Sequence, residues 1–242
     1  MIKKGIYLVF LLICCFQNYS QSNSDSLHLN FNLKFNKLPL ELNKNYVSDT
    51  KDTLSISTFK CYVSNIQIQY SDNSRFIQND SQHLLDFDSS NSFQIPICKK
   101  SDKLISKITF NIGIDSLTNT AGAMAGDLDP IKGMYWAWQS GYINMKIEGK
   151  STRCKTRKNE FQFHIGGYLS PFYAMRKVEI NGNDNSNFNS NDNFNSNNKI
   201  NIAIELNDFF SKIQLSQTNS VMIPGKIALE LANDSVKMFH LE

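Results

Sequence analysis

Apolar and polar residues alternate along most of this chain. Between residues 27 and 35, every second residue is Leu or Phe and the residues between them are polar or basic. A β-strand places successive side chains on opposite faces of its sheet, so this stretch predicts a strand with one buried face. The same period of two recurs in further short stretches, at residues 59–63, 66–70, 108–114, 143–147, 161–165 and 200–206.

Many short alternating strands without a long helical pattern predict an all-β protein. A sandwich or a barrel fits this pattern, and we expect an antiparallel β-sandwich of short strands joined by long loops. Helix is expected only as a short turn from Asn207 to Ile213, with Asn207 or Asp208 as its cap. No linker divides the pattern, so residues 23–242 are expected to form one β-sandwich domain. Residues 181–198 are almost entirely Asn, Ser and Asp, which predicts a disordered loop within that domain.

The N-terminus has the features of a secretory signal peptide. Lys3 and Lys4 form a positive region, and the apolar run from Ile6 to Cys15 is too short to span a bilayer. Small residues at positions 20 and 22 place cleavage after residue 22, which assigns residues 1–22 to the signal peptide. Cleavage after residue 20, or a lipoprotein with lipid on residue 14 or 15, are the alternatives. No second long apolar run follows, so we expect no membrane span and a periplasmic, cell-surface or secreted protein.

Net charge and cysteine content indicate which partners and which thiol chemistry to expect. The formal net charge is only +3 and the lysines are scattered among acids, so no nucleic-acid partner is expected. After cleavage Cys61, Cys98 and Cys154 would remain in an oxidising compartment, and their three possible pairings stay open. Cys154 lies in the basic run STRCKTRK, which predicts a lowered thiol pKa and exposure to oxidation.

The aromatic residues gather in one place. Both tryptophans of the chain lie in GMYWAWQSGY, residues 133–142, and the strand FQFHIGGY, residues 161–168, follows with a histidine. Such a cluster is typical of a core or of a binding surface, because indole is apolar but carries an N–H that needs a partner when buried. The motifs GxSxG and HExxH and a Gly-rich phosphate loop are absent, so the protein is expected not to be an enzyme.

A series of motifs connects the chain to a known family. They are YVSNIQI at 62–68, HLLDFD at 83–88, IGID at 112–115, GDLDP at 126–130, GMYWAWQSGY at 133–142, FHIGGY at 163–168, VMIP at 221–224 and MFHL at 238–241. In this order they resemble the MbnP-like family, over nearly the whole mature chain. The central tryptophan motif is the specific part of the resemblance.

The resemblance implies a secreted copper-binding protein. In some members a di-haem peroxidase-like enzyme, the expected partner, oxidises one tryptophan to kynurenine. Kynurenine has an aniline nitrogen that can bind copper together with imidazoles, which copper prefers. The matching residue in this chain is Trp136 or Trp138, with Trp136 favoured.

The supply of histidine limits the expected copper site, because the chain has four histidines. His164 is the best ligand candidate, since it lies with Gln162 on the strand face opposite to the apolar residues. His83 is the second candidate, and Asp86 either orients its imidazole or caps a turn. Met134 either supplies a thioether, which suits Cu(I), or fills a gap in an aromatic core.

The tryptophan motif departs from the family in one respect. No histidine follows either tryptophan, so a second histidine ligand has to come from elsewhere in the chain. The alternative function is a non-catalytic β-sandwich that binds carbohydrate or protein through an exposed platform of Trp136, Trp138 and Tyr142. A purely structural envelope domain, with both tryptophans in the core, is the third interpretation.

Overall fold

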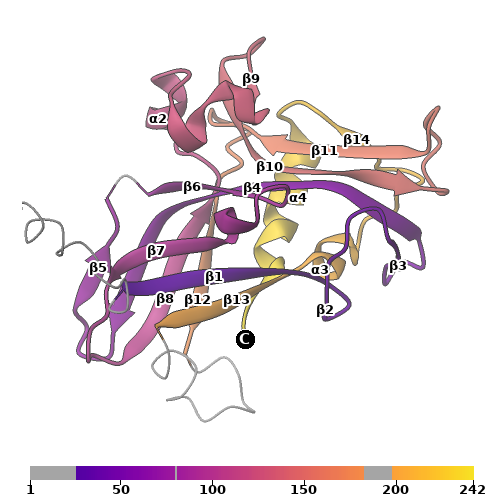
Figure 1. Ribbon diagram of the computed structural model, residues 1–242. Coiled ribbons are helices and arrows are strands. Elements are labelled where there is room, and N and C mark those ends of the chain that lie inside the picture. Colours follow the sequence, from indigo (N-terminus) through magenta and orange to yellow (C-terminus); the bar gives the residue numbers. More distant parts are fainter. Residues whose placement is uncertain (1–25, 80, 183–197) are drawn as a thin grey trace, which may run out of the picture.

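The structure, a computed structural model, describes residues 26–79, 81–182 and 198–242. The expected signal peptide, residues 1–22, lies outside the described residues, as does most of the expected disordered loop, residues 183–197. The described residues form two β-sheets with a few short helices (Figure 1).

Sheet A is the smaller sheet and has five strands. They are β1 (Ser26–Phe35), β2 (Leu38–Pro39), β7 (Gln94–Lys99), β13 (Lys199–Glu205) and β15 (Phe239–Leu241). In β1, buried residues alternate with half-buried ones along its whole length, as the sequence predicted. The partner of β1 on one side is β13, from the far end of the described chain, and the two run parallel.

Sheet B has ten strands and is organised around β4. They are β3 (Asn45–Val47), β4 (Thr53–Tyr70), β5 (Arg75–Ile77), β6 (Gln82–Asp86), β8 (Ile105–Ile112), β9 (Tyr135–Trp136), β10 (Gly141–Ser151), β11 (Glu160–Gly166), β12 (Arg176–Asn181) and β14 (Ser220–Val221). The sequence predicted two short strands where the structure has the single strand β4. Asn65, at φ 50°, and a register shift between Ser64 and Gln67 mark a bulge, which bends the strand without ending it.

The all-β class predicted from the sequence is confirmed, but the sheets are not antiparallel throughout. Two pairs are parallel, β1 with β13 and β11 with β14. Parallel neighbours need a long connection between them, and period-two alternation carries no information about which distant strand becomes the partner.

Helices occupy short connections and one longer segment. They are α2 (Ser116–Thr120), α3 (Leu206–Phe210), α4 (Lys226–Ser235) and the 3-10 turns η2 (Ser90–Phe93), η3 (Gly126–Leu128), η4 (Pro130–Lys132) and η5 (Val236–Met238). The expected helical turn near Asn207 is α3. Its cap is Glu205 instead of Asn207 or Asp208, because the Glu205 side chain accepts from the backbone N–H of Asn207. The sequence analysis missed α4.

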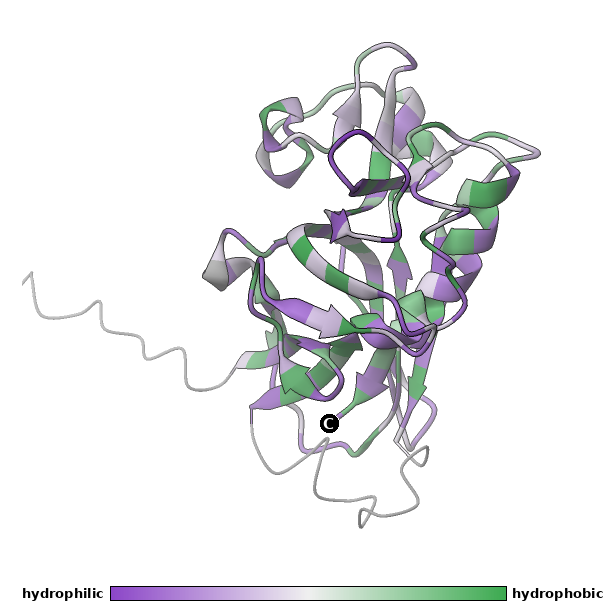
Figure 2. Ribbon diagram, turned by 90° about the vertical axis from the view of Figure 1, so that its right-hand side faces the viewer, coloured by the Kyte–Doolittle hydropathy of each residue, from purple (hydrophilic) through white to green (hydrophobic). Residues whose placement is uncertain are grey.

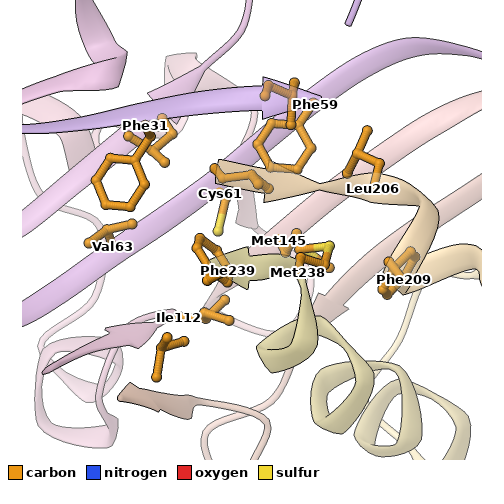
Figure 3. Close-up of a cluster of buried hydrophobic side chains, with 14 of the residues drawn as sticks. Phe31, Phe59, Cys61, Val63, Ile112, Met145, Leu206, Phe209, Met238 and Phe239 are labelled. Atoms are coloured by element: carbon orange, nitrogen blue, oxygen red, sulfur yellow. The ribbon is translucent and has the colours of Figure 1, made fainter. Parts of the chain in front are cut away.

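The main core lies between the two sheets. Figure 3 shows part of it, where side chains of both sheets meet α3 and η5. The Phe31 ring of sheet A meets the Phe110 ring of sheet B edge-on, with 5.7 Å between ring centroids. Figure 2 shows the underlying pattern as green and purple bands along the strands. Burial of these apolar faces is the main stabilising contribution to the fold.

A third layer covers the opposite face of sheet B. Residues 114–140, from the end of β8 to the start of β10, form this outer layer, which carries α2 and β9 at the top of Figure 1. It encloses a second core, made of Tyr62, Leu84, Ile114, Leu128, Met134, Trp136, Tyr142 and Ile143. No helix within the described ranges is long and apolar enough to cross a membrane.

Candidate functional site

Aspartates shape the turns of the outer layer. The Asp115 carboxylate accepts from the backbone N–H of Thr118 at 2.8 Å and caps α2, and Asp129 accepts from the N–H of Ile131 at 2.9 Å and caps η4. Each bond satisfies an N–H that has no partner within its helix. These turns lead the chain into the tryptophan motif.

Two lysines of sheet B fasten the tryptophan motif to the sheet. Lys60 of β4 donates from Nζ to the carbonyl of Lys132 at 3.2 Å, and Lys146 of β10 donates to the carbonyl of Gly133. Both carbonyls lie at the C-terminal end of η4, where a positive charge is favourable. The motif that follows is therefore held against the outer face of sheet B.

The Trp136 ring packs against strand β11 at a glycine. A Cβ atom built on Gly166 would lie 2.7 Å from Cζ3 and 2.9 Å from Cη2 of Trp136. These distances are too short for any side chain, so glycine at this position is what lets the indole approach the strand. With only 6% of its surface exposed, Trp136 belongs to the second core.

His164 lies on the same face of β11, two residues before Gly166. Successive residues on one face of a strand are about 7 Å apart, so the backbone of His164 lies about 7 Å from that of Gly166, against which Trp136 packs. His164 is on the face opposite to the main core, as predicted, but it is only 7% exposed. Its Nε2 is 2.6 Å from Oε1 of Glu148 on β10.

The bond to Glu148 fixes the hydrogen-bonding roles of the imidazole. It is the largest of the causes that hold the pKa of Glu148 below its ordinary value. An ionised carboxylate only accepts hydrogen bonds, so Nε2 of His164 carries the proton that it donates. In the neutral ring Nδ1 then keeps a lone pair that can bind a metal.

Glu148 and Gly166 belong to the candidate site but were not predicted from the sequence. Alternation puts Glu148 on the polar face of β10, but only the hairpin register decides which β11 residue it meets. In that register Glu148 lies opposite Gln162, and Lys146 lies opposite His164. The glycine pair in FHIGGY was visible in the sequence, although the ring that lies on it was not.

The structure does not bring His83 to this site. In β6, His83 lies opposite Val63 of the main core, whereas His164 lies opposite Lys146 on the outer face of the sheet. Nε2 of His83 is 3.0 Å from Oε1 of Gln78. Asp86, expected to orient His83 or cap a turn, pairs with Lys60 at 2.7 Å and accepts from the N–H of Asp88.

The other two histidines lie elsewhere. His28 is in β1 and His240 is in β15, both in sheet A. Among the described residues, no group of three or more His, Cys, Asp or Glu side chains is arranged to hold a metal ion. Of the four histidines, all of which lie in the described part of the chain, His164 is the one on strand β11, against which Trp136 packs.

The aromatic residues of the motif separate into a buried set and an exposed one. Trp138 is 63% exposed, whereas Tyr142 is 1% exposed and Met134 is completely buried in the second core. The expected platform of Trp136, Trp138 and Tyr142 is thus wrong for two of its three rings. Backbone bonds explain part of this difference, because β9 pairs with β10 through Trp136 but ends before Trp138.

A hollow of about 280 Å³ opens next to the motif. Its lining residues are Gln139, Gly167, Tyr168, Leu169, Ser170, Phe172 and Pro224. Leu169 and Phe172 are exposed, and Trp138, also exposed, directly precedes the lining residue Gln139 in the chain. This surface is the exposed part of the site.

The three described cysteines are free thiols. Cys61 and Cys154 are buried, and burial, helped by the charge of Asp52, raises the pKa of Cys154 to about 11. The predicted low pKa of Cys154 is wrong, because the thiol turns inward from its basic loop. The surrounding positive charge does not outweigh the loss of solvent.

The fold and the site define a β-sandwich protein in which a buried tryptophan packs on the outer face of one sheet, against the strand whose histidine is hydrogen-bonded to a carboxylate. The chain belongs to the MbnP family, whose family model matches residues 24–223. MbnP from Methylosinus trichosporium has a similar fold, with a TM-score of 0.58 and 12% sequence identity over 84% of this chain and 82% of that chain. No curated protein matches the chain.

Proposed function

We propose that this chain is an exported copper-binding protein, and not an enzyme, with copper bound between His164 and a ligand made from Trp136. One observation carries the proposal. The Trp136 indole rests on Gly166, one pleat from an imidazole whose Nε2 is held by Glu148. A carboxylate in this position orients an imidazole so that its other nitrogen points to a metal.

The side chains of the site supply suitable copper ligands only if Trp136 has been oxidised. One imidazole nitrogen is too few ligands for tight binding, and an intact indole is a poor metal ligand. Oxidation of Trp136 to kynurenine would add an aniline nitrogen next to His164, and copper accepts such nitrogen donors. Met134, which packs in the same second core, is the remaining protein candidate for a third ligand through its thioether.

Trp136 is favoured over Trp138 as the modified residue because its ring packs against β11, the strand that carries His164. It also assigns the oxidation to a separate di-haem peroxidase-like enzyme, for which this chain is the substrate. Export of the chain, with residues 1–22 removed as a signal peptide, would bring the two proteins into one compartment.

Mass spectrometry of protein from the native host tests the modification. Trypsin cleaves after Lys132 and Lys146 and releases the peptide from Gly133 to Lys146, which contains both tryptophans. We expect kynurenine at Trp136 and bound copper in native protein, and neither in protein from a host without the modifying enzyme. Native protein with two intact tryptophans and no copper would contradict the proposal.

Substitutions test the ligands. In native-host protein, His164→Asn should lower the copper content or affinity, because it removes the imidazole and keeps a polar side chain. His240→Asn is the matched control, since His240 lies in sheet A. Glu148→Gln should weaken copper binding by roughly tenfold or more, as is typical when the group that orients a ligand is lost. Unchanged copper binding in His164→Asn would remove His164 from the site.

A second candidate function is supported by the exposure of Trp138. The ring is 63% exposed, and the next residue, Gln139, lines the hollow that also contains Tyr168 and Phe172. Exposed aromatic side chains of this kind bind sugars and protein surfaces. Trp138→Ala should then abolish binding to a glycan array or to a captured envelope protein. Equal binding by the variant and the wild type would exclude this candidate.

A further inference from the structure

The two tryptophans differ sharply in exposure although they are close in space. Their ring centroids are 5.9 Å apart and their planes are tilted by 47°. Trp136 is 6% exposed and Trp138 is 63% exposed. Any protein-sized or bulky reagent therefore meets Trp138 first.

We infer that Trp138 is an electron relay, through which the buried Trp136 loses an electron to an oxidant that stays outside the protein. The inference rests on the proposed function, because it takes Trp136 as the residue that is oxidised. Trp138 then passes an electron from Trp136 to the oxidant and is not a copper ligand.

An external one-electron oxidant takes one electron from the Trp138 ring and is itself reduced. The Trp138 radical cation takes one electron from Trp136 and returns to its original state. The Trp136 radical cation releases its indole N–H proton to water, so the net change is one electron and one proton lost by Trp136.

Geometry favours this route over direct oxidation. Electron transfer depends on orbital overlap, which falls steeply with distance, and two indoles at this separation have their ring edges close together. Gly166 and the second core cover Trp136, so an oxidant that cannot enter the protein cannot reach its ring. Tyr135 offers a competing entry point, because it directly precedes Trp136 in β9 and is only half-buried.

A photochemical experiment tests the relay with unmodified, copper-free protein. Tris(bipyridine)ruthenium(III), generated by light flashes, is a bulky one-electron oxidant that reaches only exposed rings. After a fixed series of flashes, tandem mass spectrometry of the Gly133 to Lys146 peptide measures oxidation at Trp136. Trp138→Phe should slow this oxidation about tenfold, equivalent to about 1.4 kcal/mol in activation free energy.

Three further variants separate a relay from other effects. Trp138→Tyr keeps a ring that can be oxidised and should restore much of the rate. Tyr135→Phe and Leu169→Ala should leave the rate unchanged, because they alter the competing entry point and the neighbouring apolar surface. Acrylamide quenching of the remaining fluorescence in Trp138→Phe checks that Trp136 has not become exposed.

Oxidation of Trp136 at the wild-type rate in Trp138→Phe would overturn the relay, as would a Trp138→Tyr variant as slow as Trp138→Phe. Neither result bears on copper binding, which is measured on native-host protein. Conversely, native protein without kynurenine would end the proposed function and leave the relay measurement standing.

Discussion

The indole of Trp136 occupies the space where Gly166 would carry a side chain, with 2.7 Å between Cζ3 and the position of a Cβ. The contact between Trp136 and Gly166 joins the outer layer to strand β11, and the candidate site depends on it. A substitution that adds a side chain at Gly166 tests this contact most directly.

Gly166→Ala should displace Trp136 and destabilise the protein by about 1–3 kcal/mol, as overpacking usually does. Urea unfolding measures the loss, and a red shift of tryptophan emission reports the displaced ring. In a double variant with Trp136→Phe the cost of the added methyl group should shrink, because the two residues are in contact. If the changes in the free energy of unfolding are additive, the contact between Trp136 and Gly166 does not contribute to stability.

Trp136 and Trp138 should differ in their contribution to stability. Trp136→Phe removes buried ring atoms from the second core and should cost about 1–3 kcal/mol. Trp138→Phe changes an exposed ring and should cost less than about 0.5 kcal/mol. Denaturation curves of the two variants give the comparison directly. An equal loss of stability in the two variants would show that the Trp138 ring is packed as closely as that of Trp136, which would contradict the structure.

Thiol reactivity should follow burial and not the charge of the surrounding loop. Burial raises the thiol pKa of all three cysteines, but Cys98 is only half-buried whereas Cys61 and Cys154 are buried. At pH 8 a maleimide should label Cys98 first in the folded protein and all three in urea, because the thiolate is the reactive form. Peptide mass spectrometry identifies the labelled residue, and rapid labelling of Cys154 would contradict the structure.

His83 should make stability fall in mild acid. Burial lowers the pKa of His83, although the nearby Asp127 carboxylate opposes the shift. The unfolded chain then binds more protons than the folded one below about pH 6.5, so the free energy of unfolding decreases as the pH falls through and below that value. His83→Gln should flatten this part of the stability profile while matching the wild type near pH 8. An unchanged slope in the variant would contradict the assignment.

The strands could be predicted because the alternation of apolar and polar residues is visible within each short stretch of sequence. Strand β1 shows this most clearly. Helix α4 was missed although Ala228, Leu231, Ala232 and Ser235 are buried at helical spacing, because short polar residues weaken that pattern. The bulge at Asn65 was missed because a single residue with positive φ leaves the alternation on either side intact.

The candidate site shows what a local pattern cannot contain. Trp136 and Trp138 are two residues apart, so in an extended chain they share a phase and the sequence cannot tell them apart. Their different burial comes from the glycine on β11 and from the end of β9, both of which are set by tertiary pairing. The partner of His164 is likewise set by hairpin register, which places Glu148 within reach.

Strand β10 serves two cores, since Met145 and Ile147 belong to the main one while Tyr142 and Ile143 belong to the second. The second core can therefore unfold while the main core stays folded. Detaching the outer layer breaks the lysine bonds at Lys132 and Gly133 and leaves the contacts between the sheets in place. Amide hydrogen exchange should therefore find a low-energy partial unfolding in which residues 114–140 exchange before β4 does. In that state Trp136 would be open to solvent while the sandwich stays folded.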